Sequence, residues 1–199
     1  PVRSLLLNGK ADASNAAGDM RTQLLLGHLP ALLAPSMPGG EAMVIGLGSG
    51  VTAGAVASWP YDKVTAAEIE PMVARAARFF DRENQRVLDN ARVELRVDDA
   101  RRILDRSPGG LRLITSEPSN LWMSGVSLLF TREFFELAGG KPFEVLLLRH
   151  PETDNVRNGR QGRKESAAFC GKSGAGRGQN THLRSDMETT GQRTGARRR

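Results

Sequence analysis

The chain has 199 residues, of which 39% are hydrophobic, enough for one domain with a sizeable core. Its net charge of +6 lies in residues 151–199, which hold 11 Lys and Arg against 5 Asp and Glu, whereas the first 150 residues hold 17 of each sign. The folded part therefore gives no electrostatic reason to expect a nucleic-acid partner.

The cysteine content and the hydropathy of the chain indicate the cellular compartment in which we expect it. The single cysteine, Cys170, rules out a disulfide within one chain and fits a reducing environment. No stretch approaches the roughly 18 consecutive apolar residues of a membrane span, and no signal peptide is visible. We therefore expect a cytoplasmic protein. Because the chain begins at Pro1 rather than at a methionine, we also expect it to be a piece of something longer.

Residues 1–40 read as an N-terminal segment that precedes the main domain. The apolar run 5–7 is followed by Asn8-Gly9, which predicts a strand or a hairpin. Residues 20–34 have the composition of an apolar helix that ends near Pro35.

Residues 41–150 alternate between short apolar runs and segments of helical spacing. This alternation predicts an α/β fold, a Rossmann-like, doubly wound and mostly parallel sheet with helices on both faces. The strands look apolar throughout, as strands buried on both faces do. Strands are expected at 42–45, 63–67, 93–97, 111–115 and 143–148, and helices at 51–58, 71–80, 100–105 and 131–138.

Residues 151–199 have a different amino-acid composition. Gly, Arg, Ser, Thr, Gln and Asn dominate, and apolar periodicity is lost, so we interpret this segment as a basic, disordered tail. A nucleic-acid-binding tail and a shifted reading frame are alternatives that the sequence leaves open.

Polar features follow three successive predicted strands. The loop Gly46-x-Gly48-x-Gly50 follows the first strand and opens a helix. Glu68 ends the next strand about 20 residues further on, where a carboxylate suits two ribose hydroxyls. Asp99 ends the third, within reach of an adenine amino group. Since the carboxyl ends of parallel strands share one edge of a sheet, these features together predict an adenosine site.

The spacing of the glycines indicates which kind of adenosine cofactor is bound. The dinucleotide fingerprint G-x-G-x-x-G would need a glycine at position 51, which is Val51. The spacing G-x-G-x-G instead resembles the first motif of S-adenosylmethionine-dependent enzymes.

Four runs carry a more specific resemblance: "VIGLGSGVTAGAV", "AEIEP", "DDARRIL" and "SEPSNLWMSGVSLLFTREFFEL". Together they resemble the spermidine synthase-like aminopropyltransferases, within the class I S-adenosylmethionine-dependent methyltransferase-like superfamily. The resemblance covers roughly residues 5–138. It is strongest to a bacterial branch in which the domain is often fused to a membrane region, so the resemblance leaves such a region in a longer parent protein open.

The resemblance implies a reaction and a set of residues. The family transfers an aminopropyl group from decarboxylated S-adenosylmethionine to a polyamine amine, and methylthioadenosine leaves; no metal is needed. A small polyamine or diamine is the implied partner, and the oligomeric state, homo-oligomer included, stays open. The implied cofactor contacts are Gly46, Gly48, Ser49, Gly50, Glu68, Asp99 and Ala100.

The stretch "SEPSN" (116–120) takes the place of the family's Asp-Ser-(Ser/Thr)-Asp-Pro-like motif. Glu117 stands for the first aspartate, which orients or deprotonates the attacking amine, and Asn120 stands for the second. Trp122 is expected to shape the substrate pocket. A role for Glu117 in capping the turn or pairing with Arg132 is the structural alternative.

The sequence departs from the family at two places that matter for function. Ser49 stands where the family carries an aspartate that holds the aminopropyl amine. After Ala138 only one apolar run remains, so the last strands of the fold are expected to be missing, and the activity of this chain stays open. An S-adenosylmethionine-dependent methyltransferase and a catalytically silent module that binds an adenosine metabolite or polyamine are therefore the alternatives.

Overall fold

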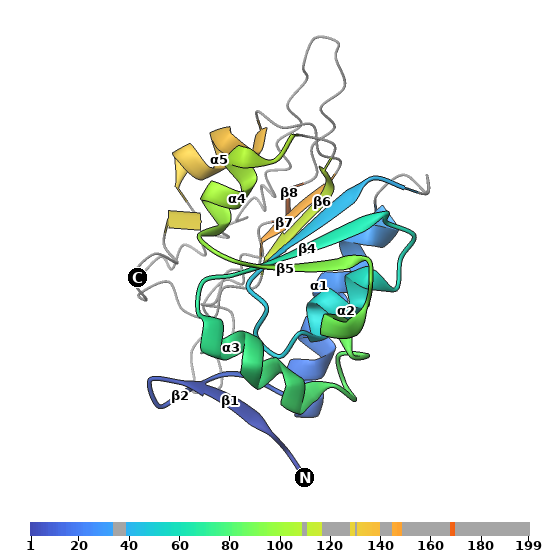
Figure 1. Ribbon diagram of the computed structural model, residues 1–199, viewed down its shortest axis with the longest axis vertical. Coiled ribbons are helices and arrows are strands. Elements are labelled where there is room, and N and C mark those ends of the chain that lie inside the picture. Colours follow the sequence, from blue (N-terminus) through green and yellow to red (C-terminus); the bar gives the residue numbers. More distant parts are fainter. Residues whose placement is uncertain are drawn as a thin grey trace, which may run out of the picture.

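A computed structural model of the chain describes residues 1–33, 39–108, 111–116, 128–129, 131–139, 145–148 and 168–169. These residues form a two-stranded hairpin, β1-β2, and a six-stranded sheet in the order β5-β4-β3-β6-β7-β8 (Figure 1). The strands are β1 (Ser4–Leu7), β2 (Lys10–Ser14), β3 (Glu41–Ile45), β4 (Lys63–Glu68), β5 (Val93–Val97), β6 (Leu111–Ser116), β7 (Val145–Leu148) and β8 (Ala168–Phe169). The helices are α1 (Ala17–Leu33), α2 (Val51–Ala57), α3 (Pro71–Ala76), η1 (Ala77–Phe80), η2 (Val87–Asp89), α4 (Ala100–Arg106) and α5 (Arg132–Gly139).

The central sheet confirms the predicted Rossmann-like, doubly wound α/β fold. Strands β3 to β7 run parallel, and β8 pairs antiparallel with β7. Alternate residues of β3 point to opposite faces, as strand geometry requires. Ala42 and Val44 pack in the core on the α1 and α2 side, and Met43 and Ile45 pack in a second core on the α4 and α5 side. Figure 1 shows these two helix pairs on opposite faces of the sheet.

The N-terminal hairpin packs on α3 rather than on the central sheet. Figure 1 shows the hairpin beside α3. Leu5 of β1 lies in a small apolar cluster with Val73 and Phe80. An ion pair of 2.6 Å between Arg3 and Glu83 ties the start of β1 to the segment after η1. The hairpin predicted around Asn8-Gly9 is thus confirmed, and it lies over the first helices of the domain.

The predicted helix 71–80 is divided in the structure. Helix α3 ends at Ala76, and the chain continues as the 3-10 helix η1. The side-chain amide of Asn84 donates to the Ala77 carbonyl at 3.0 Å, which is the acceptor that an α-helix would offer to the Asp81 N–H. The Asp81 N–H donates to the Arg78 carbonyl instead, so a contact from outside the helix decides its last turn.

Two further expectations need correction. Strand β5 is not buried on both faces, because it stands first in the strand order and its residues are half-buried or exposed. Glu94 of β5 makes an ion pair of 2.6 Å with Lys63 of β4. Two residues of the tail predicted to be disordered, Ala168 and Phe169, form β8; the rest of 151–199 lies outside the described residues.

Candidate functional site

The strand order reverses between β3 and β6. From β3 the chain moves outward through β4 and β5, and then crosses back to place β6 on the other side of β3. In doubly wound sheets the crevice outside the carboxyl ends of the strands at such a reversal binds ligands. Ile45 and Ser116, the last residues of the two strands, lie level with each other, and the Ser116 hydroxyl donates to the Ile45 carbonyl at 3.1 Å.

The glycine loop leaves β3 at this reversal. Gly46, Gly48 and Gly50 have φ angles of 87°, 52° and 82°, in the left-handed region that glycine adopts without steric cost. A Cβ added at Gly46 would meet no atom within 4 Å, whereas one at Gly50 would lie 2.9 Å from Asn84 Nδ2. The loop is therefore open at Gly46 and packed at Gly50.

Glu68 ends β4 beside the glycine loop and is only 8% exposed. Its Oε2 accepts from the backbone N–H of Leu47 at 2.9 Å and of Gly48 at 3.5 Å. Its Oε1 accepts from the N–H groups of Ile69 and Glu70 at 2.9 and 3.0 Å. The carboxylate thus already holds the loop, and the Gly48 contact is its longest and weakest.

Ser49 faces away from the open side of the loop. It is 1% exposed, and its hydroxyl donates to the Gln23 side-chain oxygen of α1. Asn84 holds the other side of the same residue, since its amide donates to the Ser49 carbonyl at 2.9 Å. The predicted cofactor contact of Ser49 stays a prediction, and its side chain offers almost no free surface for one.

Asp99 caps α4 at the end of β5. Its carboxylate accepts from the Arg101 N–H at 2.8 Å and forms a 2.6 Å ion pair with the Arg101 guanidinium. The hydrogen bond from that guanidinium lowers the pKa of the Asp99 carboxyl, although partial burial opposes the shift. Asp98 precedes it, and its N–H donates to the Glu68 carbonyl at 3.0 Å. Ala100 is buried beneath the first turn of α4.

The structure thus brings together part of the predicted site. The glycine loop, Glu68 and the Asp99-Ala100 pair follow the three neighbouring strands β3, β4 and β5. Their contacts with a cofactor stay predictions. Glu117, Asn120 and Trp122 lie outside the described residues; the last described residue of β6, Ser116, lies level with Ile45 at the start of the glycine loop.

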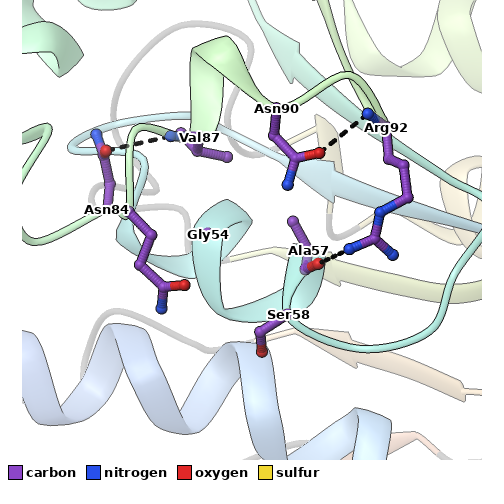
Figure 2. A pocket seen from close by; sticks show the side chains of 8 residues that line it. Gly54, Ala57, Ser58, Asn84, Val87, Asn90 and Arg92 are labelled. Atoms are coloured by element: carbon purple, nitrogen blue, oxygen red, sulfur yellow. Dashed lines mark hydrogen bonds between the residues drawn. The ribbon is translucent and has the colours of Figure 1, made fainter.

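A small hollow lies behind the loop, at the opposite end of α2 (Figure 2). Its volume of about 200 Å³ is below the range of about 300–1,000 Å³ usual for small-molecule pockets. The Arg92 guanidinium closes it by donating to the carbonyls of Ala57, Trp59 and Tyr61. Asn84 and Arg92 both line this hollow, and none of the residues predicted to contact the cofactor lines it.

Two residues that hold the loop were missed by the sequence analysis. Asn84 has no motif around it, and its role depends on contacts with Ser49 and Ala77, which are distant in the chain. Gln23 has a weak signal, because it is a polar residue next to the apolar run 24–26.

Metal and membrane features can be assessed only over the residues that the structure describes. Within them, no three His, Cys, Asp or Glu side chains gather in a group suited to a metal ion. The helices described there are also too short or too polar to cross a bilayer.

Comparison with known proteins supports the fold. No protein-family profile matches the sequence, and no curated protein does either. A spermidine synthase solved in complex with the transition-state analogue AdoDATO superposes with a TM-score of 0.63 and 20% identity, covering 72% of this chain and 48% of that one. The spermidine synthase from Thermotoga maritima gives a TM-score of 0.60 and 21% identity, covering 75% and 50%.

The chain has the fold of the spermidine synthases. It spans about half the length of these two proteins. The predicted resemblance is therefore supported at the level of fold.

Proposed function

We propose that this chain is the adenosyl-binding part of a spermidine synthase-like aminopropyltransferase. The observation that carries the proposal is the glycine loop at the β3–β6 reversal, open at Gly46 and bonded to the Glu68 carboxylate, in a fold shared with spermidine synthases. One of those synthases was solved with AdoDATO, a transition-state analogue. Decarboxylated S-adenosylmethionine is the proposed co-substrate.

The proposed binding mode uses the carboxyl ends of β3, β4 and β5. The thioether and ribose would lie over Gly46, where a Cβ would meet nothing. A ribose hydroxyl would take the place of the 3.5 Å contact from the Gly48 N–H on Glu68. The adenine would lie toward Asp99 and Ala100, at the start of α4.

The proposed chemistry belongs to the stretch after β6. A polyamine nitrogen attacks the aminopropyl carbon bound to the sulfonium; the new C–N bond forms as the C–S bond breaks. Methylthioadenosine leaves as a neutral thioether, so its departure calls for no metal. Glu117 would bind the amine and accept its proton, while Asn120 and Trp122 would contact the rest of the polyamine.

Calorimetric titration of the chain with methylthioadenosine and with S-adenosylhomocysteine tests the proposal. An aminopropyltransferase site should prefer methylthioadenosine, which has no carboxylate. A preference for S-adenosylhomocysteine would favour the methyltransferase alternative, and binding of neither would contradict an adenosyl site.

A matched pair of glycine variants locates the ligand. Gly46→Ala fills the open side of the loop and should weaken methylthioadenosine binding at least about tenfold, since each tenfold step corresponds to about 1.4 kcal/mol. Gly9→Ala, in the turn of the β1-β2 hairpin, has a similar positive φ of 78° and no neighbour within 4 Å, so it carries the same backbone strain and should bind as the unmodified chain does. If both variants bind methylthioadenosine equally well, the ligand does not bind at the glycine loop.

The role of Glu117 has its own test. Glu117→Gln should lower aminopropyl transfer by about 100-fold or more, which is typical for loss of a general base, and should leave methylthioadenosine binding unchanged. Unimpaired transfer would contradict that role. A chain that binds methylthioadenosine but has no transfer to lose would instead be a binding module.

A further inference from the structure

The buried side chain of Gln23 connects three parts of the molecule. Of the five buried residues of α1, the other four are Leu26, Gly27, Pro30 and Ala31, so Gln23 is the polar one. It is 6% exposed. A buried amide costs free energy unless both its N–H and its oxygen are hydrogen-bonded, which makes its partners informative.

Both ends of the Gln23 amide are bonded, each to a different element. Nε2 donates to the Ser14 carbonyl at 3.0 Å, at the last residue of the hairpin. Oε1 accepts from the Ser49 hydroxyl in the glycine loop. The backbone carbonyl of Gln23 also accepts from Thr52 Oγ1 of α2, at 3.1 Å.

The hairpin and the loop also touch directly beside this amide. A Cβ added at Gly48 would lie 3.8 Å from the Ala13 Cβ, one residue before Ser14. Two other side chains hydrogen-bond to the loop: Glu68 at the end of β4 and Asn84 in the segment after η1. Gln23 supplies the hydrogen bond that holds the loop from the N-terminal part of the chain.

We propose that Gln23 is a positioning residue, which holds the glycine loop in its binding conformation and makes that conformation depend on the seating of the N-terminal hairpin. A leucine would fill a similar volume but would release both Ser14 and Ser49. The consequence for ligand binding rests on the proposed function, whereas the consequence for the loop itself does not.

Amide hydrogen exchange in the unliganded chain tests the loop directly. Gln23→Leu should speed exchange of the Leu47, Gly50 and Val51 amides about tenfold relative to the β3 amides, because the loop opens locally. Thr52→Val is the matched control: it removes a buried hydrogen bond to the same residue but none to the loop. Thr52→Val should change the exchange rates of the loop amides and of the β3 amides by the same factor.

Ser49→Ala keeps the test decisive if Gln23→Leu fails to fold. It removes the same loop contact from the other side and should reproduce the faster exchange of the Leu47 and Gly50 amides. The Val51 amide is left out of this comparison, because it donates to the Ser49 hydroxyl at 3.3 Å. For the Leu47 and Gly50 amides the double variant should exchange no faster than the faster single variant, because both substitutions break the Gln23–Ser49 hydrogen bond. Unchanged loop exchange in Ser49→Ala, or equal effects of Gln23→Leu and Thr52→Val, would overturn the proposal.

Ligand titration separates this inference from the proposed function. If the unmodified chain binds methylthioadenosine, Gln23→Leu and Ser49→Ala should raise its dissociation constant about three- to tenfold, and Thr52→Val should not. Equal dissociation constants in all four proteins would overturn the positioning role. If the unmodified chain binds neither nucleoside, the proposed function fails and the exchange measurements still decide the role of Gln23.

Discussion

Glu68 and Asp99 end neighbouring parallel strands, and the structure treats their carboxylates differently. Glu68 accepts hydrogen bonds from four backbone N–H groups and has no arginine or lysine partner among the ion pairs of the described residues. Asp99 caps a helix and is paired with Arg101, whose guanidinium is partly exposed.

One sequence motif, an acidic residue at the end of a strand, is thus held in two ways: by backbone amides at Glu68 and by an arginine side chain at Asp99. The Leu47 and Gly48 amides cannot move away from Glu68 without moving the glycine loop, and the Ile69 and Glu70 amides hold its other oxygen, so this carboxylate is part of a rigid scaffold. The Arg101 side chain can leave Asp99 without disturbing the backbone, so Asp99 can exchange its partner for a ligand. The loop side of the site is preorganised, and the Asp99 side is adaptable.

Asn84→Ala should cause the largest loss in the free energy of unfolding, because Asn84 holds the glycine loop, the preorganised side of the site. Asn84 is 0% exposed and donates to the carbonyls of Ser49 and Ala77. Its removal leaves the buried Ser49 carbonyl without its Asn84 donor and the Val87 N–H without its Asn84 acceptor, which should lower the free energy of unfolding by about 3 kcal/mol. Asn90→Ala, on the rim of the same hollow (Figure 2), loses only an exposed contact with the Arg92 N–H and should cost less than about 0.5 kcal/mol by urea denaturation.

Glu68→Gln should have the second largest effect. The amide keeps one oxygen, but its NH₂ group must face N–H donors that the carboxylate accepted. We expect a loss of about 2 kcal/mol in the free energy of unfolding, from the unmet backbone donors. Urea denaturation measures it; a loss below that of Asp99→Asn would contradict the contrast between the two carboxylates.

Asp99→Asn should cost less, because the asparagine oxygen still caps α4. The variant loses only the ion pair with Arg101, and a partly exposed pair contributes about 0.5 kcal/mol. Arg101→Gln should cost a similar amount, and the double variant should be no less stable than either single one. Additive losses would mean that the two side chains act independently.

The smallest effect is the pH dependence of the Asp99 pair. Because Arg101 lowers the pKa of the Asp99 carboxyl, the pair stabilises the protein above the ordinary carboxyl pKa, and this contribution is lost as the pH falls through the lowered value. The stability difference between the chain and Asp99→Asn should therefore be constant from pH 7 to about pH 5 and shrink below about pH 4. A difference that grows in acid would contradict the sign.

The fold class and the order of the strands and helices could be predicted from the sequence. The runs at 42–45, 63–67, 93–97 and 111–115 became β3, β4, β5 and β6 within a residue at either end. After Glu41, strand β3 is a continuous apolar run, as burial on both faces requires, whereas β5 at the edge alternates apolar and charged residues. The glycine loop and the acids after β4 and β5 were also visible, since strand ends and positive-φ glycines have local signatures.

The contacts that hold these elements together could not be predicted, because they depend on tertiary packing. The end of α3 depends on Asn84, and the direction of the Ser49 side chain depends on Gln23, which lies 26 positions earlier. Nor does local pattern show that Glu68 would be bonded by backbone amides and Asp99 by an arginine. The bonds from Ser49 to Gln23 and from the loop to Glu68 join residues 20 to 26 positions apart. Asn84 and Ala77 are 7 positions apart, and Asp99 and Arg101 only 2. In each case the side chain takes one partner among several within reach, and periodicity and propensity do not encode that choice.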